Sequence, residues 1–419
     1  MSVETVDTAP RGFLGWLDKR FPVMAVWNDH MAQYYAPKNM GLWSIFGSLA
    51  LVVLVIQIVS GLWLAMSYKP SAAEAFASVE YIMRDVNWGW LLRYIHSTGS
   101  SFFFILVYLH MFRGLMWGSY KNPRELLWII GVIIYLAMMA TAFFGYLLPW
   151  GQMSYWGAQV IVNLFAAVPE VGTELSTWVR GDYVISDVTL NRFFAFHFVI
   201  PFLLAALVFV HIVALHRVGS TNPDGIEIKK GPKGNKWDAN QPADGIPFHP
   251  YYTVKDITGL VVFLAIFSLV VFYAPDLGGL FLEPPNFQPA DPLKTPEHIA
   301  PVWYFTPYYA MLRAVPPIGG SQFPGVVVMF GAILILFLLP WLDRSPVRSM
   351  RYKGNLSRFF LGAFAVSFVV LAYLGLMPST DLYTLLAQIF TVVYFAFFLL
   401  MPIYTKLEKT KPVPERVTS

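Results

Sequence analysis

The chain has 419 residues, of which 57% are hydrophobic and only 13% are charged, whereas a soluble globular domain carries about 25% charged residues. Most of its surface is therefore expected to face lipid. The absence of cysteine excludes disulfides, thiol catalysis, iron–sulfur clusters bound by thiolates and c-type haem attachment within the chain. The formal net charge is only +4, and the basic residues form no patch that indicates nucleic acid as a partner.

Residues 1–35 lack the short apolar segment and cleavage site of a signal peptide, so the first spanning helix is expected to direct insertion itself. Apolar runs of about 20 residues are long enough to cross a bilayer. Eight such runs follow, at residues 42–66, 92–116, 126–148, 193–215, 257–273, 324–341, 359–377 and 384–404. The sequence thus predicts an all-α membrane protein with eight transmembrane helices.

The connections between these runs differ in composition. Residues 150–180 are partly apolar, which suits interfacial helices, and residues 277–320 are rich in proline, glycine and aromatics, which indicates an ordered outer loop with one amphipathic helix near 302–313. Residues 219–250 are polar and basic and indicate an extramembrane loop. The expected units are an N-terminal segment (1–41), a four-helix bundle (42–216), a cytoplasmic loop (217–253), four later helices with the outer loop (254–405) and a tail (406–419).

Eight spans put both termini on one side of the membrane, and the basic residues indicate which side. Of the 29 Lys and Arg residues, 22 lie on the side of the termini and 7 on the opposite side. Because basic residues accumulate in cytoplasmic loops, both termini are expected in the cytoplasm. The extended ends of the chain favour a bacterial inner (plasma) membrane over a mitochondrial one.

Four histidines lie within the predicted spans in two pairs with the same spacing. His96 and His110 are on the second span and His197 and His211 on the fourth, each pair 14 residues apart. Fourteen residues of α-helix make four turns less about 40°, so both imidazoles of a pair point to nearly the same face, about 21 Å apart along the axis. The two spans run in the same direction, so His96 is level with His197 and His110 with His211. Bis-histidine ligation of two stacked b-type haems is the predicted result.

These histidines have other possible interpretations. A single histidine inside a membrane is more often a hydrogen-bonded core residue or a proton relay than a haem ligand, but two level pairs favour ligation. A zinc site needs four clustered ligands. A proton or solute transporter would line one pathway with its polar groups, and the haem-binding anchor subunit of a dehydrogenase would be shorter and would not need the long outer loop.

Glycines and arginines fit the same pattern. Four glycines repeat the 14-residue spacing on the first and third spans: Gly47 and Gly61, then Gly131 and Gly145. Glycine lets a haem edge approach a helix closely, although ordinary helix packing explains many such pairs. Arg93 and Arg113 lie three residues from His96 and His110, where a guanidinium can pair with a haem propionate or reach the lipid headgroups.

The chain resembles the cytochrome b family in several motifs. These are Arg93-Tyr-Ile-His96, Gly145-Tyr-Leu-Leu-Pro-Trp-Gly-Gln-Met-Ser154, Tyr252-Thr-Val-Lys-Asp256 and Trp303-Tyr304. The likeness covers about residues 35–405. It implies ubiquinol–cytochrome c oxidoreductase activity, two haem b groups, ubiquinol and ubiquinone as substrates, and a homodimeric complex that contains a Rieske iron–sulfur protein and cytochrome c1. The residues leave open whether the quinone is ubiquinone or menaquinone.

The resemblance also implies two quinone sites. The outer, quinol-oxidising site would include Tyr146, Trp156, Gly157, Pro301, Val302, Trp303 and Tyr304. Most family members have a proton-accepting glutamate where this chain has Val302. Glu297, Tyr304 or a bound water are the candidate replacements.

The inner, quinone-reducing site would lie near His110 and His211. It would include His216, Ser220, Lys255 and Asp256, because protonation of a reduced quinone requires titratable groups with a route to the cytoplasm. An exposed salt bridge is the alternative interpretation of Lys255 and Asp256.

Overall fold

The computed structural model describes residues 12–32, 34–228 and 244–418, so parts of the predicted N-terminal segment and cytoplasmic loop lie outside the described residues. Eight helical segments of the described chain are long and apolar enough to cross a membrane, as predicted. They are Leu42–Ala65, Gly89–Trp117, Glu125–Leu147, Asp187–Val218, Phe248–Tyr273, Phe323–Leu342, Asn355–Leu376 and Asp381–Leu399. Helices suit this environment because each satisfies its own backbone hydrogen bonds away from water.

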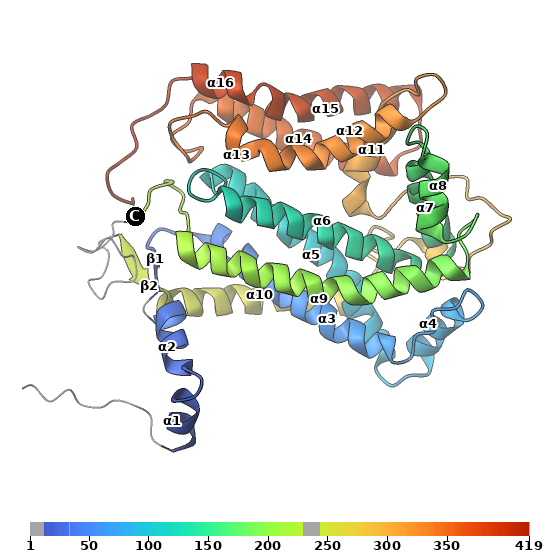
Figure 1. Cartoon of the computed structure of the whole chain (residues 1–419), viewed down its shortest axis with the longest axis horizontal. Helices are drawn as coiled ribbons and strands as arrows, with labels where there is room; N and C mark the ends of the chain where they lie inside the picture. Colours follow the sequence, from blue (N-terminus) through green and yellow to red (C-terminus); the bar gives the residue numbers. More distant parts are fainter. Residues whose placement is uncertain (1–11, 33, 229–243, 419) are drawn as a thin grey trace, which may run out of the picture.

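The first four spans form a bundle of two helix pairs. Helix α3 (Phe46–Ala65) packs along α5 (Gly89–Trp117), and α6 (Glu125–Leu147) packs along α9 (Asp187–Val218) (Figure 1). Helix α9 begins six residues before the predicted span, because Ser186 and Thr189 form a capping box at its start. Helix α5 ends at Gly118, whose φ of 67° is the left-handed conformation that glycine adopts at helix ends.

The later spans are more interrupted than predicted. Helix α10 (Thr253–Tyr273), α14 (Asn355–Leu376) and α15 (Asp381–Leu399) are continuous, whereas the sixth span divides into α12 (Phe323–Leu334), the 3₁₀ turn η6 (Ile335–Leu338) and α13 (Leu339–Leu342). The predicted eighth span also breaks, because a separate helix, α16 (Met401–Leu407), follows α15. Pro340 and Pro402 stand at the starts of the new segments, where proline cannot continue the preceding helical hydrogen bonds.

Shorter elements cover the two ends of the bundle. At one end lie the predicted interfacial helices, α7 (Gln152–Ala166) and α8 (Gly172–Arg180), together with α4 (Ala75–Arg84), which was not predicted (Figure 1). The outer loop contributes the 3₁₀ turns η4 (Pro284–Phe287) and η5 (Trp303–Phe305) and the helix α11 (Thr306–Ala314), close to the amphipathic helix expected there.

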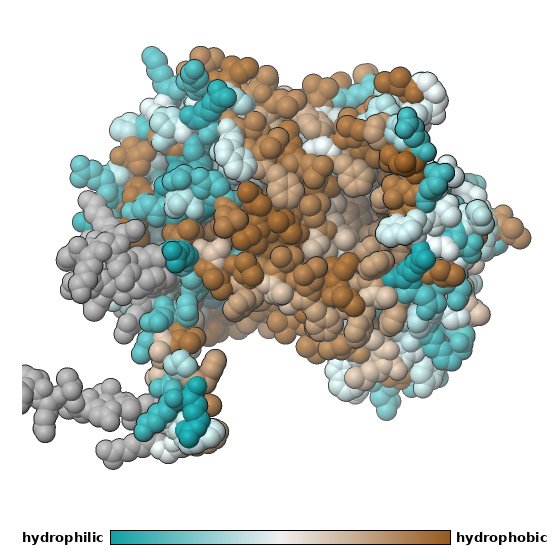
Figure 2. Space-filling view, in the orientation of Figure 1, coloured by the Kyte–Doolittle hydropathy of each residue, from teal (hydrophilic) through white to brown (hydrophobic). Residues whose placement is uncertain are grey.

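The opposite end carries the short N-terminal elements and the elements that directly precede α10. These are α1 (Phe13–Asp18), α2 (Val23–Trp27), η1 (Asn28–Ala32), η2 (Leu42–Ser44), η3 (Phe248–Tyr252) and the antiparallel strands β1 (Tyr35–Pro37) and β2 (Gly245–Pro247). The C-terminus lies at this same end (Figure 1), as an even number of spans requires. Figure 2 shows an apolar band between two more polar ends, which is the surface expected of a membrane-spanning protein.

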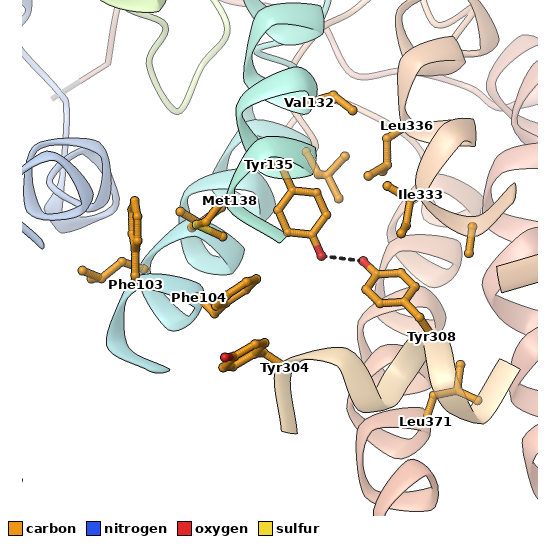
Figure 3. Close-up of a cluster of buried hydrophobic side chains, with 14 of the residues drawn as sticks. Phe103, Phe104, Val132, Tyr135, Met138, Tyr304, Tyr308, Ile333, Leu336 and Leu371 are labelled. Carbon is orange, nitrogen blue, oxygen red and sulfur yellow. Dashed lines mark hydrogen bonds between the residues drawn. The ribbon is translucent and has the colours of Figure 1, made fainter. Parts of the chain in front are cut away.

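A buried cluster joins the four-helix bundle to the second group of helices (Figure 3). The Tyr304 ring stacks on Phe104 of α5, with ring centres 3.9 Å apart and planes 4° apart. Close by, the hydroxyls of Tyr135 on α6 and Tyr308 on α11 are hydrogen bonded at 2.8 Å. Burying these hydroxyls is tolerable because each has a partner, and the outer loop is thereby held against the bundle.

Candidate functional site

The structure brings the four predicted histidines together in the expected pairs. The ring centres of His96 and His197 are 6.0 Å apart, and those of His110 and His211 are 6.4 Å apart. A bond from a metal ion to an imidazole nitrogen is about 2 Å, so two rings on opposite sides of one ion have centres about 6 Å apart. Both pairs therefore have the spacing that a bis-histidine iron requires.

Hydrogen bonds in the outer pair leave the inward-facing nitrogens available. His197 Nδ1 lies 2.8 Å from the Thr141 carbonyl oxygen, so it must donate its proton there. The Ser60 hydroxyl donates to the Ile56 carbonyl at 2.7 Å, so its oxygen accepts from His96 Nδ1 at 3.0 Å. With Nδ1 protonated in both rings, each Nε2 keeps the lone pair that a metal ion needs.

The four predicted glycines pack against the histidine rings. A Cβ atom on Gly61 would lie 3.0 Å from His96 Cε1, and one on Gly145 would lie only 2.3 Å from His197 Cε1. The inner pair repeats this arrangement, with 3.0 Å from Gly47 to His110 and 3.3 Å from Gly131 to His211. The glycines were predicted to admit a haem edge. In the structure the glycines accommodate the imidazole rings themselves, because each ring lies directly against a glycine of the neighbouring helix.

A cavity of about 410 Å³ opens from the outer pair, with a second of about 130 Å³ beside it. His96, His197, Gly145 and Arg93 line both cavities. Near the inner pair, Arg113 Nη2 lies 3.1 Å from His110 Nδ1, while its buried Nε has no hydrogen-bond partner among the described residues. A buried donor without a partner is costly, and a haem propionate is a group that could satisfy it. The ring spacing at both levels and the cavity beside the outer pair therefore fit haem.

The larger cavity extends to three of the residues predicted for quinol oxidation: Tyr146, Val302 and Tyr304. Gly157 lies beside this region, since a Cβ on it would be 3.4 Å from Tyr146 Cε1. Val302 and Tyr304 are buried, and the partly buried Pro301 precedes them. These residues give the cavity a largely apolar wall of the kind that binds a flat ring.

The other predicted outer-site residues are more distant from the cavity wall. The Trp303 indole donates to Ser101 Oγ at 3.0 Å, and the Trp156 indole donates to the Asp291 carbonyl at 3.2 Å, so both hold the outer loop. Glu297 is exposed and is not among the described residues that line the cavity. The structure therefore gives no support to Glu297 as the replacement for the missing glutamate.

Glu283 is the titratable group near this cavity that sequence reasoning missed. Its neighbours Leu282 and Asn286 line the cavity, and its carboxyl interacts with the Tyr146 hydroxyl and the Asn286 amide. Burial raises the pKa of Glu283 to about 7, although the nearby polar groups of its own backbone, Tyr146 and Asn286 lower it. The sequence signal was weak, because Glu283 stands in a proline-rich loop outside every motif.

The predicted inner-site residues lie at the end of the bundle that carries the termini. The His216 ring stacks on Tyr34, with ring centres 4.7 Å apart, and its Nδ1 lies 3.0 Å from His30 Nδ1. The hydroxyls of Tyr34 and Ser220 are 3.0 Å apart. His30 and Tyr34 were not predicted, since they precede the first apolar run and reach His216 only through the fold.

Lys255 and Asp256 lie on the first turns of α10. Lys255 Nζ donates to the Met40 and Gly41 carbonyls and to Ser44 Oγ, each at 2.7 Å. The structure has no Lys255–Asp256 salt bridge among the described residues, so the alternative interpretation of an exposed pair is wrong. The Asp256 carboxylate is partly buried, and no Lys, Arg or His of the described residues forms a salt bridge with it.

Comparisons with known proteins agree with this geometry. Residues 31–219 match the family model for cytochrome b/b6/petB, and residues 289–395 match the C-terminal cytochrome b/b6/petD model. The cytochrome b of Allochromatium vinosum is 76% identical over 97% of this chain and 98% of its own length. The cytochrome b of Rhodospirillum rubrum is 51% identical over 97% of this chain and 96% of its own.

A solved structure described as a hyperthermophilic respiratory Complex III contains a similar chain. Its TM-score is 0.86 at 41% sequence identity, and the match covers 94% of this chain and 99% of that one. Both the sequence and the arrangement of the spans are therefore shared over nearly the whole length. The chain belongs to the cytochrome b family, the haem-carrying membrane subunits of quinol–cytochrome c oxidoreductases.

Proposed function

We propose that this chain binds two b-type haems, one between His96 and His197 and one between His110 and His211, and conducts electrons from quinol across the membrane. The observation that carries the proposal is the repetition of one ring spacing, 6.0 and 6.4 Å, in both pairs. Haem held by two imidazoles supplies one-electron transfer without binding oxygen. The protein would hold the imidazole rings against glycines of the neighbouring helices and keep water away from them.

The arginines would bind the haem propionates. Arg93 lines the outer cavity, and the Nε of Arg113, which has no hydrogen-bond partner among the described residues, lies close to the inner pair. A guanidinium at each level would fix the orientation of one macrocycle through charge-assisted hydrogen bonds. Residues 42–216 would thus form the haem-binding unit, and residues 254–405 would complete the quinol site from outside.

Quinol would be oxidised in the outer cavity, where Tyr146, Val302 and Tyr304 meet beside the His96–His197 pair. Quinone would be reduced at the inner end, near His216, Ser220, Lys255 and Asp256, with ubiquinone and ubiquinol as the expected substrates. His216 is in the last turn of α9 and Asp256 in the first turn of α10, so both lie at the end of the bundle that carries β1 and β2 and could exchange protons with the cytoplasm.

The expected partners are a Rieske iron–sulfur protein, cytochrome c1 and a second copy of the complex. The fold likeness to a chain of a respiratory Complex III supports an assembly of this kind. Bacterial relatives and the excess of basic residues at the end of the termini support a bacterial inner membrane with both termini in the cytoplasm.

Replacing one ligand in each pair tests the haem assignment. His197→Asn and His211→Asn should each lower the haem b content from two per chain to one, because each change leaves one iron with a single imidazole. Pyridine haemochrome analysis of the purified complex gives the count. If either variant keeps both haems, that histidine is not a ligand.

The close contacts between glycines and imidazole rings predict a graded effect of glycine substitutions on haem binding. Gly145→Ala should displace His197 and lower the amount of haem bound at the outer pair severalfold, since the added carbon would meet Cε1 at 2.3 Å. Gly131→Ala, at 3.3 Å, should have a small effect, and Gly362→Ala, which would meet nothing within 4 Å, should have none. Reduced-minus-oxidised spectra measure the amount of bound haem. Equal spectra for all three variants would show that the glycines are not needed to accommodate the histidine rings.

Asp256→Asn tests the inner site. The substitution should slow reoxidation of the inner haem about tenfold or more, because a positioned proton donor contributes about 10²–10⁴-fold. Outer-site quinol oxidation should still reduce that haem. Stopped-flow spectroscopy at the haem b absorbance separates the two steps, and reoxidation at the wild-type rate would remove Asp256 from the site.

A further inference from the structure

The outer cavity lacks a base at the position where the family resemblance implies one. Val302 is 4% exposed and carries no titratable group. Quinol oxidation releases protons, and they need an acceptor close to the reacting hydroxyl. The cavity therefore has to recruit a carboxylate or another base from elsewhere in the chain.

The Tyr146 hydroxyl is placed to connect the cavity with such a base. Tyr146 lines the cavity, and its hydroxyl is buried without a hydrogen bond to any described residue at 3.5 Å or less. The polar groups that act on it are the Glu283 carboxyl, the Tyr304 hydroxyl and the Asn286 amide. A buried hydroxyl with unused hydrogen-bonding capacity in an apolar cavity gains from a ligand hydroxyl that completes it.

We propose that Glu283, reached through the Tyr146 hydroxyl, accepts the proton that quinol releases in the outer cavity and so replaces the glutamate absent at Val302. The inference rests on the proposed quinol site. It makes Glu283 a proton acceptor that acts through Tyr146, with no direct contact to the substrate required.

In this arrangement two simultaneous transfers carry a proton from quinol to Tyr146 and from Tyr146 to Glu283. The O–H bond of quinol breaks and its oxygen keeps the electron pair, while the proton passes to the Tyr146 oxygen. The Tyr146 proton passes at the same time to a carboxylate oxygen of Glu283, so one negative charge moves from Glu283 to the quinol oxygen. The deprotonated quinol then holds the electrons that the oxidoreductase activity withdraws.

Other titratable groups near the cavity are less suited to this role. Glu80 lines the cavity, but its carboxylate is already paired with the Arg84 guanidinium at 2.6 Å. Burial raises the pKa of Tyr304 well above its ordinary value, so its hydroxyl keeps its proton. Glu297 is exposed and outside the cavity wall.

Glu283 also has a way to release the proton. It is partly buried, and the next residue along the chain, Pro284, is exposed on the outer loop. Because its pKa is about 7, it can take up and release a proton near neutral pH. Above pH 7 the Glu283 carboxylate is ionised and can accept a proton, and below pH 7 it is increasingly protonated. The rate of quinol oxidation should therefore fall as the pH falls.

The experiment compares Glu283→Gln with Glu297→Gln in the purified complex, with a short-chain ubiquinol as substrate and cytochrome c as acceptor. Glu283→Gln should lower the rate about 100-fold at pH 8 and flatten the pH profile around pH 7. Glu297→Gln should retain the wild-type rate and profile. Haem difference spectra should be unchanged in both, which establishes that the proteins are folded.

Two further variants keep the test decisive. Tyr146→Phe should reproduce the loss without removing the carboxyl, and Glu283→Gln combined with Val302→Glu should recover most of the rate because a carboxylate returns to the cavity. A wild-type rate in Glu283→Gln, or a double variant as slow as the single one, would overturn the inference. Absence of ubiquinol oxidation by the wild-type complex would instead refute the proposed function.

Discussion

The structure depends on one constraint: two helices must present imidazoles at equal heights, about 6 Å from ring centre to ring centre, at two levels. Helices α5 and α9 meet this requirement, and their partners α3 and α6 carry glycine wherever an imidazole presses against them. The partner helices cannot retreat to accommodate a side chain without losing their own packing. Histidine spacing and glycine spacing are therefore two consequences of the same geometry.

The second group of helices completes the outer site. The cavity beside the His96–His197 pair is closed by Val302 and Tyr304 of the outer loop. Tyr304 is held in place by its stack on Phe104, and Tyr308 by its hydrogen bond to Tyr135 (Figure 3). On the proposed function, quinol would bind where the outer-loop surface meets the four-helix bundle, next to the His96–His197 pair.

The spans and the histidine pairs could be predicted from the sequence because they depend on local regularities. Hydropathy over about 20 residues identifies a span, and a helical period of 3.6 residues brings residues 14 apart to one face. The same reasoning missed α4, whose ten residues are too few to produce such a signal. It also joined segments that break at Pro340 and Pro402, where the prolines themselves were the available indication.

The quinone sites were less predictable because they depend on tertiary contacts. Glu283 is distinguished from Glu297 by its interaction with Tyr146, and the two lie more than 100 residues from that tyrosine in sequence. Likewise, Tyr34 reaches His216 only because β1 pairs with β2 beside the end of α9. Composition and spacing carry no information about such contacts, so the motif resemblance located the regions but not every residue that acts in them.

The most direct test of the central geometry is a quantitative electron paramagnetic resonance spectrum of the oxidised protein. Two irons, each bound by two imidazoles, predict low-spin ferric signals that integrate to two spins per chain, with no high-spin signal from a five-coordinate haem. A single low-spin centre, or a high-spin signal of comparable intensity, would contradict the account.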